Sequence, residues 1–437
     1  MKKIKIVVVD DDPTGIQTVY GCKLLTSWSE KLITKAFADS TSFFYILTNN
    51  RAFSEDIAKK NITELVRNVL AVNKKFGFQL IFVSRSDSTL RGHFPLETDL
   101  IEKVIKVRSG KIIDNTFFVP AFFEGGRITK DNIHYIKQGN DLVPMNKTEF
   151  ANDSVFGYKN ADITKYIEEK TNGRVRSGKI ASVSLDTIRN LNEPDLMDYI
   201  NSLKNKYVVV NSENYTDLDK IAAVILKLTS SGKNFLIRGA ASIVKSLARL
   251  KEKPLLDKKL LNTKGLPGIL IVGSYIIRTT DQMKTLLLDD RTAGVEINVD
   301  EITPEKIRIK QEILNRIEEI INSGRSPVLY TSRKEKIFKS VSERLAFGRE
   351  ISEFLVSLIQ EIKPAPGFII AKGGITSADI LTDALGVKFT TVLGQIDAGI
   401  PVLLTPEECR FPEIPYVIFP GNVGEKETLQ EVFNRLV

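Results

Sequence analysis

Cysteine and histidine are scarce in this chain of 437 residues, and their scarcity excludes several kinds of metal site. The two cysteines, Cys22 and Cys409, lie far apart in the sequence and match no metal-ligand spacing. We expect both to be buried thiols of a protein that works in a reducing, cytoplasmic setting. Because His93 and His134 are the only histidines, a site built from several histidines is excluded.

Long apolar runs and blocks of basic residues are also absent from the sequence. A basic N-terminus leads into a few apolar residues and then three aspartates, Asp10 to Asp12, which predicts a first strand rather than a signal peptide. No apolar stretch is long enough to span a bilayer. The net charge of +8 is spread along the chain, which suits a small anionic substrate or a nucleotide. We therefore expect neither a membrane nor a nucleic acid as a partner.

The chain does contain a regular alternation of short apolar strands and amphipathic helices, which predicts an α/β fold with largely parallel sheets. Its length favours more than one domain. Residues 251–267 break the alternation with Lys and Leu in turn, two prolines and a glycine. We therefore expect an N-terminal domain over residues 1–252, a linker over 253–267 and a C-terminal domain over 268–437.

Two clusters of polar side chains follow predicted strands in the N-terminal half. Residues 84–93 place two arginines, a carboxylate and several hydroxyls after a strand predicted for residues 79–83. Residues 10–15 place three carboxylates, a proline and a glycine after the first strand. Ligands of open α/β sheets bind at the carboxyl ends of strands, so both clusters are candidate binding sites. The alternative for residues 84–93 is a loop satisfied by its own hydrogen bonds and an internal Asp–Arg pair.

Three further expectations concern local structure in the N-terminal half. A strand over residues 43–48, a helix that begins after Ser54 and the strand over residues 79–83 predict a β-α-β unit with a parallel strand pair. Residues 137–179 have weak periodicity, so we expect a loop-rich segment with a helix near residues 164–170. Two glycines before Arg127 permit either close backbone approach to a ligand or a plain turn.

The C-terminal half repeats one arrangement, in which a strand is followed by glycine with Ser, Thr or Asn and then by a helix. It occurs at Gly273-Ser274, Gly373-Gly374 and Gly421-Asn422. Exposed backbone N–H groups at such junctions favour phosphate, and three junctions that meet at one sheet edge indicate a nucleotide site. Neither a P-loop motif nor the glycine fingerprint of dinucleotide-binding folds is present, so neither of those folds is supported.

The two halves together have the organisation of a two-domain kinase. Phosphoryl transfer requires positive charge around the transferred group and a carboxylate that orients or deprotonates the acceptor hydroxyl. The N-terminal half supplies arginines and carboxylates, and the C-terminal half supplies candidate phosphate loops. We therefore expect the active site in a cleft between the two domains.

Several motifs resemble those of the four-carbon acid sugar kinase family. They are Asp-Asp-Pro-Thr-Gly at residues 11–15, Arg-Ser-Asp-Ser-Thr-Leu-Arg-Gly at 85–92, and the segments at 273–274, 373–377 and 394–401. The resemblance spans nearly the whole chain. It implies that the protein uses ATP to phosphorylate a small sugar acid such as a threonate or an oxo-tetronate. It also implies that the N-terminal domain holds the sugar acid and the C-terminal domain holds ATP.

The same resemblance implies roles for individual residues. Asp12, Asp87 and Arg91 would be catalytic, with either aspartate as the base. The resemblance also places Arg85 and Ser88 in the acid-sugar site. From their positions in the polar clusters and beside the paired glycines, we further expect Asp11, Thr14, Thr89 and Arg127 to bind the substrate. The nucleotide would be held by Ser274, Gly373, Gly374, Ile375, Thr376, Gly421, Asn422 and Gly424. We expect Mg²⁺ to arrive with the nucleotide phosphates, because no carboxylate cage is visible in the sequence. A homodimer is compatible with the sequence.

The chain departs from the family pattern at three places. It has Arg85 where many members have Lys, Pro13 where many have Leu, and Phe419-Pro420 where a Lys usually precedes the last glycine loop. The first two departures are similar to a subgroup that acts on branched or oxo sugar acids. The third weakens the phosphate contact that the resemblance implies for that Lys.

Two other functional classes fit parts of the sequence. The pattern Asp10-x-Asp12-x-Thr14 matches the first motif of haloacid-dehalogenase-type phosphatases, in which the first aspartate is a nucleophile. The later lysine and acidic pair of those enzymes have no clear counterpart in the same half of the chain. A regulator that binds a nucleotide or a sugar acid without turnover is the other alternative, because a fold does not fix a function.

Overall fold

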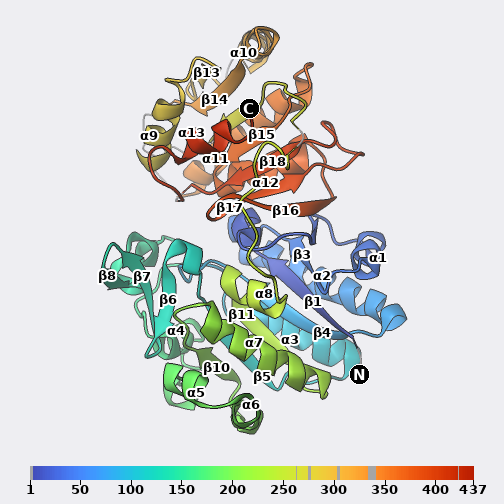
Figure 1. Cartoon of the computed structure of the whole chain (residues 1–437), viewed down its shortest axis with the longest axis vertical. Helices are drawn as coiled ribbons and strands as arrows, with labels where there is room; N and C mark the ends of the chain where they lie inside the picture. Colours follow the sequence, from blue (N-terminus) through green and yellow to red (C-terminus); the bar gives the residue numbers. More distant parts are fainter. Residues whose placement is uncertain (1–2, 262, 274–276, 303–305, 333–340, 422) are drawn as a thin grey trace. The chain divides into compact units, whose positions relative to one another are not determined.

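Each half of the chain is built around a mainly parallel sheet (Figure 1). The computed structural model describes residues 3–261, 263–273, 277–302, 306–332, 341–421 and 423–437. The chain divides into two units, Met1–Glu252 and Lys253–Val437. The predicted fold class, two α/β domains with largely parallel sheets, is confirmed.

All strands of the large N-terminal sheet run parallel, in the order β2-β3-β1-β4-β11-β5-β10-β9. These strands are β1 (Ile4–Asp10), β2 (Lys23–Leu25), β3 (Phe43–Leu47), β4 (Gln79–Arg85), β5 (Asn115–Val119), β9 (Ala181–Val183), β10 (Tyr207–Val210) and β11 (Phe235–Gly239). The central strands are buried along nearly their whole length, as their continuous apolar sequences indicate.

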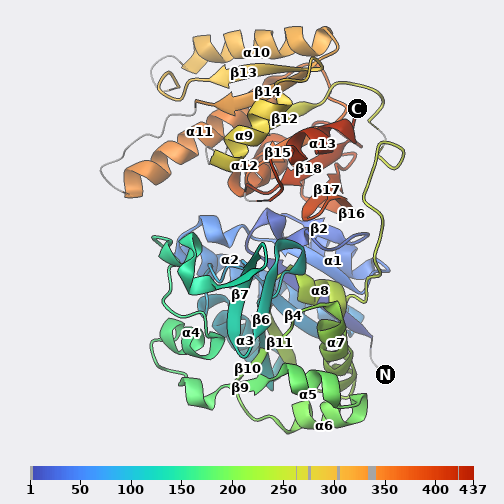
Figure 2. The ribbon, with the colours of Figure 1, turned by 60° about the vertical axis from the view of Figure 1, so that its left-hand side comes forward.

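Helices cover both faces of this sheet (Figures 1 and 2). The N-terminal helices are α1 (Glu30–Ala38), α2 (Glu55–Phe76), α3 (Leu96–Ser109), α4 (Ile163–Lys170), α5 (Leu185–Asn190), α6 (Glu193–Ser202), α7 (Tyr215–Ser230) and α8 (Ala241–Leu247). The helices α2 and α3 pack together on one face, and α7 packs with α8 on the other. As predicted, Ser54 precedes the first turn of α2, and the apolar stripe of that helix is buried.

The predicted pairing of the strands on either side of α2 is wrong. The strands β3 and β4 are parallel, but β1 lies between them and pairs with both. The connection through α2 therefore passes over β1. The first strand takes the central position because all of its residues after Ile4 are buried.

The expected loop-rich segment after residue 137 is also partly wrong. A separate antiparallel sheet contains β6 (Arg127–Lys130), β7 (Ile133–Gln138) and β8 (Asp141–Pro144), in that order. We call this sheet and the following segment to α4, residues 127–170, the insert. The weak periodicity arises because β7 and β8 are partly exposed. The helix expected near residues 164–170 is present as α4.

The C-terminal sheet has the strand order β13-β14-β12-β15-β18-β17-β16. Its strands are β12 (Ile269–Val272), β13 (Thr292–Ile297), β14 (Ser326–Thr331), β15 (Ile369–Lys372), β16 (Phe389–Asp397), β17 (Ile400–Leu404) and β18 (Pro415–Phe419). Its helices are α9 (Ile277–Leu286), α10 (Lys306–Asn322), α11 (Val341–Glu361), α12 (Gly374–Asp379) and α13 (Thr428–Asn434). The strands β13, β14, β12, β15 and β18 are parallel, and β17 is antiparallel to both of its neighbours, β18 and β16.

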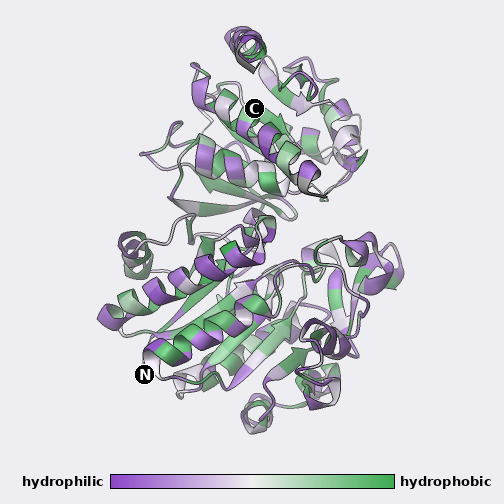
Figure 3. Ribbon diagram, turned by 180° about the vertical axis from the view of Figure 1, so that it is seen from behind, coloured by the Kyte–Doolittle hydropathy of each residue, from purple (hydrophilic) through white to green (hydrophobic). Residues whose placement is uncertain are grey.

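The apolar residues of the sheets form the cores, and Figure 3 shows the strands mostly in green between helices striped purple and green. Residues 253–267 contain no helix or strand among those described, yet Leu256 and Leu261 are buried in the C-terminal core. Cys22 is buried as predicted, but Cys409 is only half-buried. No helix in the described ranges combines the length and apolar character needed to cross a membrane.

Candidate functional site

The two polar clusters of the N-terminal half lie at the same edge of the sheet. Strands β1 and β4 pair in parallel with Asp10 opposite Arg85. The residues that follow therefore leave the sheet side by side, and the backbone N–H of Asp11 donates to the carbonyl of Arg85 at 3.2 Å. Side chains that are more than seventy positions apart in the sequence are thus brought into one group.

Arg51 joins three of these carboxylates. Its Nη2 lies 3.0 Å from Asp11 Oδ1 and 3.1 Å from Asp12 Oδ2, and its Nη1 lies 3.4 Å from Asp87 Oδ2. Sequence reasoning did not identify Arg51, although it follows the strand β3 by only a few residues and so obeys the rule that identified the other two clusters. We call Asp11, Asp12, Arg51, Asp87 and Arg91 the charged cluster.

Asp87 is tightly held within the charged cluster. Its Oδ1 accepts the backbone N–H of Thr89 at 3.0 Å, and its Oδ2 accepts Arg91 Nε at 2.7 Å and the hydroxyl of Thr89. Burial would raise the pKa of Asp87, but Arg91, Arg51 and Thr89 outweigh it, so the pKa is well below its usual range. The carboxylate therefore stays ionised and orients both arginines.

Arg91 is part of an internal ion pair, the alternative that the sequence left open. Besides Asp87, its Nη1 lies 3.5 Å from Asp153 Oδ2, and its guanidinium lies over the ring of Phe150 at 5.1 Å. Both of these residues belong to the insert. The insert therefore helps to fix the direction of Arg91.

Asp12 is held less completely than Asp87. Its Oδ1 accepts the backbone N–H of Thr14 at 2.8 Å and the hydroxyl of Thr14, while its Oδ2 faces Arg51. Burial would raise its pKa, but Arg51 and Arg85 outweigh that effect and the pKa is lowered. The Asp12 side chain is 19% exposed and that of Asp87 is 11% exposed. Of the two carboxylates, Asp12 is therefore the more accessible.

Asp10 and Arg85 form a buried pair behind the charged cluster. Arg85 Nη1 lies 3.1 Å from Asp10 Oδ1, and both side chains are almost fully buried. Burial raises the pKa of Asp10 to about 7, despite the opposite charge of Arg85. A Cβ atom at Gly15 would overlap the Asp10 carboxylate, so this turn closes directly over it. The pair is a support under the site rather than an accessible part of it.

The insert also holds the backbone of the loop that carries Asp87 and Arg91. The hydroxyls of Tyr158 and Tyr166 donate to the carbonyls of Thr89 and Leu90, both at 2.7 Å. His134 Nε2 lies 2.7 Å from the carbonyl of Ser88. Burial lowers the pKa of His134 to about 4, so it is neutral at pH 7. These bonds fix the path of the loop from outside the sheet.

Arg127, a predicted substrate residue, lies at the start of β6 in the insert. Its guanidinium lies over the ring of Phe122 at 5.8 Å, and it belongs to neither β1 nor β4. The two glycines before it form a turn in which Gly126 has a φ of +72°. The geometry thus supports the plain turn for this glycine pair.

In the C-terminal unit, the three glycine junctions follow adjacent parallel strands. Val272 of β12 pairs with Lys372 of β15, which pairs with Phe419 of β18. The residues that leave the sheet next are Gly273, Gly373 and Pro420, so the junctions meet at one edge, which we call the glycine edge.

The described residues of the glycine edge are close-packed. A Cβ atom at Gly273 would overlap the hydroxyl of Thr376, and Gly373 has a φ of +114°, which favours glycine. Ile375 is 60% exposed, which is unusual for isoleucine. Gly424 also has a positive φ. Ser274 and Asn422, both predicted nucleotide residues, lie outside the described residues.

Helix α9 holds the last glycine loop. The Thr279 hydroxyl donates to the Gly421 carbonyl at 3.4 Å, and Gln282 Nε2 donates to the carbonyls of Val423 and Glu425 at 3.2 and 2.8 Å. A cavity of about 400 Å³ lies beside this loop, lined by Ile277, Arg278, Asp281, Glu425 and Lys426. The loop therefore borders a space with charged walls.

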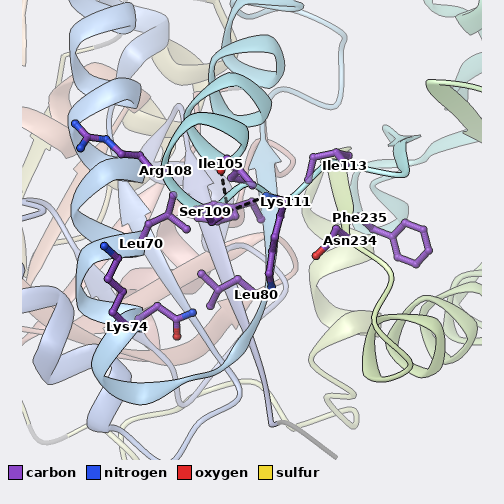
Figure 4. A pocket seen from close by; sticks show the side chains of 12 residues that line it. Leu70, Lys74, Leu80, Ile105, Arg108, Ser109, Lys111, Ile113, Asn234 and Phe235 are labelled. Atoms are coloured by element: carbon purple, nitrogen blue, oxygen red, sulfur yellow. Dashed lines mark hydrogen bonds between the residues drawn. The ribbon is translucent and has the colours of Figure 1, made fainter.

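A second cavity lies at the opposite edge of the N-terminal sheet (Figure 4). It has a volume of about 340 Å³ and is lined by the first residues of β4 and β11 and by the C-terminal turns of α2 and α3. Basic residues at helix C-termini are favoured by the helix dipole, which accounts for Lys74 and Arg108 there. This cavity is separate from the charged cluster.

No group of three or more His, Cys, Asp or Glu side chains suited to a metal ion is found within the described ranges. A divalent cation would therefore need ligands from a substrate as well as from the protein.

Comparison with known protein families also divides the chain into an N-terminal and a C-terminal domain. The sugar-binding N-terminal domain family matches residues 6–247, and the nucleotide-binding C-terminal domain family matches residues 269–429. The chain therefore belongs to the four-carbon acid sugar kinase family, whose members combine these two domains.

Two solved structures share the fold over almost their whole length. A Haemophilus influenzae protein of the DUF1537 family is 15% identical, with a TM-score of 0.64, and the match covers 99% of this chain and 100% of that one. A Salmonella typhimurium LT2 protein with a provisional tRNA synthase name is also 15% identical, with a TM-score of 0.70 and 98% coverage of both chains. No curated protein matches the chain.

Proposed function

We propose that this protein is an ATP-dependent kinase that phosphorylates a hydroxyl of a small sugar acid of about four carbons. The observation that carries the proposal is the charged cluster at the carboxyl ends of β1 and β4, in a domain of the sugar-binding family. Carboxylates and arginines at one strand edge suit a ligand that carries hydroxyls and a carboxylate. The nucleotide-binding domain family supplies the other half of the reaction.

Asp12 is the better candidate for the base. Its Oδ2 lies 3.1 Å from Arg51 Nη2, and its side chain is more exposed than that of Asp87. In the proposed step, the substrate hydroxyl oxygen attacks the γ-phosphorus while its proton passes to Asp12 Oδ2. The bond from the γ-phosphorus to the bridging oxygen breaks, and ADP leaves with that electron pair.

The arginines are proposed to bind the substrate carboxylate and to offset charge at the site. Arg91 Nε donates to Asp87, so the Nη atoms of the guanidinium can bind the substrate carboxylate. The substrate carboxylate would then replace the longer contact of Nη1 to Asp153. Thr14 orients Asp12, and Thr89 orients Asp87. Ser88 and Asp11 are proposed to border the sugar acid from the same loops.

The glycine edge is proposed to bind the nucleotide phosphates through backbone N–H groups. The positive φ angles of Gly373 and Gly424 and the dense packing at Gly273 support backbone rather than side-chain recognition. The predicted partners Gly374, Ile375, Thr376 and Gly421 lie in or beside these turns. The exposed Ile375 side chain offers an apolar surface to the nucleotide.

Mg²⁺ is proposed to enter with ATP, because a metal-binding set of side chains is not found in the described part of the chain. Excess EDTA should therefore abolish turnover, and added Mg²⁺ should restore it. Full activity in EDTA would contradict this part of the proposal.

The test is ATP consumption by the purified protein with a panel of four-carbon sugar acids and oxo sugar acids. A phosphorylated product identified by ³¹P NMR and mass spectrometry is the expected result. Binding of a sugar acid and of ATP without turnover would instead support the regulator. The phosphatase is poorly supported, because its nucleophile would be Asp10, whose carboxylate is buried, paired with Arg85 and closed over by Gly15.

A further inference from the structure

Lys372 occupies an apolar position at the glycine edge. It is the last residue of β15, two positions after Ile370, so both side chains lie on the same face of the sheet. Its partners in the register, Val272 and Phe419, belong to the apolar core that packs on α9 and α13. The lysine side chain itself is fully buried. A charged side chain thus ends a row of core residues.

The Lys372 ammonium has no anionic partner among the described residues. Nζ lies 3.3 Å from the carbonyl of Pro420 and 3.8 Å from the ring centre of Phe419. Val272, Phe419 and Pro420 add no charge, and Arg278 of α9 adds a positive one. Burial and then Arg278 lower the pKa of Lys372 to about 7.

A buried lysine without a counter-ion is costly to a fold, and such groups become neutral unless negative charge is supplied. Lys372 lies directly below the turns that begin at Gly273, Gly373 and Pro420. These are the turns proposed above to bind phosphates. A polyphosphate there acts on the amine through a medium of low dielectric, so it raises the proton affinity of Lys372 without direct contact.

We propose that Lys372 is the buried counter-charge of the phosphate site, and that it takes up a proton when a nucleotide binds at the glycine edge. The inference rests on the proposed nucleotide site and adds a linkage between proton uptake and nucleotide affinity. Lys372 acts on the phosphates through its charge and through the Pro420 carbonyl that it holds, so it is a positioning residue. Lys372 lies on the strand next to Phe419-Pro420, so it supplies positive charge close to the place where the family pattern has a lysine.

Proton uptake by Lys372 makes nucleotide affinity fall as pH rises. Below pH 7 the free protein already carries the proton, so binding takes up little. Above pH 7 the free amine is neutral, and binding requires proton uptake, which weakens affinity as pH rises. Affinity for the nucleotide should therefore be roughly tenfold lower at pH 8.5 than at pH 6.5, apart from the ionisation of the nucleotide itself.

The test is isothermal titration calorimetry of a non-hydrolysable ATP analogue with Mg²⁺, in buffers of different ionisation enthalpy at pH 7.5. The wild-type protein should take up more than about half a proton beyond that measured for Lys372→Met. The Lys372→Met variant should bind more weakly at pH 6.5 and lose the additional pH dependence. Lys388→Met, at an exposed lysine of the same unit, is the matched control and should behave as wild type.

A purely structural lysine predicts the opposite results. Lys372→Met would then raise the melting temperature, leave nucleotide affinity unchanged and take up as many protons as wild type, and the inference would be overturned. If Lys372→Met does not fold, the wild-type protein alone decides, because zero proton uptake at pH 7.5 also overturns it. A wild-type protein that binds no nucleotide overturns the proposed function, whereas pH-independent binding overturns only this inference.

Discussion

The edges of the two sheets use opposite means to present polar groups. At the charged cluster, the polar groups belong to side chains, and each carboxylate is already paired with an arginine or a hydroxyl. At the glycine edge, the described turns contribute mainly backbone, and Lys372 is the buried charge without a counter-ion. A paired cluster can discriminate the shape of a small ligand, because exchanging partners costs little when a ligand supplies equivalent bonds. A backbone edge accepts any phosphate chain of suitable geometry.

The largest effect is expected where the backbone edge is blocked. Gly374→Val places a branched side chain at the first residue of α12, beside the turn at Gly373. Nucleotide binding should be abolished, because the backbone can no longer approach phosphate, while sugar-acid binding should remain nearly intact. Calorimetry with each ligand separately measures both.

Gly348→Val is the matched control for this substitution, because Gly348 lies exposed in α11 with open space around its Cβ position. It should bind both ligands normally. Unchanged ATP affinity in Gly374→Val would rule out this turn as a phosphate site.

The next largest effect is expected from the proposed base. Asp12→Asn should lower kcat by roughly 10²–10⁴-fold with little change in sugar-acid affinity, because Asn cannot accept the proton. Asp87→Asn should instead chiefly lower the melting temperature, since it leaves the buried ends of Arg51 and Arg91 with a weaker partner. Steady-state kinetics on the folded variants, with melting curves, separate the two outcomes. The reverse pattern would assign the base to Asp87.

A smaller effect is expected for Arg91→Lys. Lysine cannot keep the bond to Asp87 and also present a planar pair of donors to a substrate carboxylate. The KM for the sugar acid should rise by about 10–100-fold, with a much smaller fall in kcat. If KM stays the same while the melting temperature falls, Arg91 serves only its internal ion pair.

The smallest effect concerns Glu97, which lies buried behind the charged cluster. Its carboxylate accepts Asn50 Nδ2 and Ser84 Oγ, both at 3.1 Å, and burial, with the charge of Asp11, raises its pKa to about 7. A folded pKa above the unfolded value means that the folded state holds the proton more tightly. Wild-type stability should therefore fall as pH rises from 4.5 to 7.

Glu97→Gln should remove this part of the pH dependence and leave the variant more stable than wild type at pH 8, by about 1–3 kcal/mol. Urea unfolding at pH 5 and pH 8 measures it. Glu55→Gln, at an exposed position, is the control and should follow wild type. Parallel pH profiles for wild type and Glu97→Gln would show that Glu97 keeps its ordinary pKa.

Much of the fold follows from the sequence, because short continuous apolar runs favour buried parallel strands and amphipathic periodicity favours helices. The strand over residues 79–83 and the helix after Ser54 are the respective examples. Strand β16 was not predicted, since Gly394 interrupts its alternation and the pairing with β17 shifts register there. The antiparallel sheet of the insert was not predicted either, because β7 and β8 bury little surface.

Site residues were predictable as candidates where they follow a predicted strand, but their contacts with one another were not. Asp12, Asp87 and Arg51 all follow strands in the sequence, but nothing in the sequence indicates that Arg51 bridges the two aspartates. Lys372 directly precedes the predicted glycine junction at Gly373-Gly374, and nothing in the sequence indicates that it is buried. Because it is the last residue of β15, its side chain falls on the core face.

The hydrogen bonds from the insert to the loop that carries Asp87 and Arg91 can form only late in synthesis of the protein. Tyr158 and Tyr166 follow the residues that they hold, Thr89 and Leu90, by 69 and 76 positions. On the ribosome, the loop therefore emerges well before the side chains that shape it. Such distant contacts form late, because the intervening chain must first be ordered. A nascent chain that ends before Tyr158 already carries Asp12, Asp87 and Arg91, but the loop with Asp87 and Arg91 gains the two tyrosine bonds only once the insert has been made.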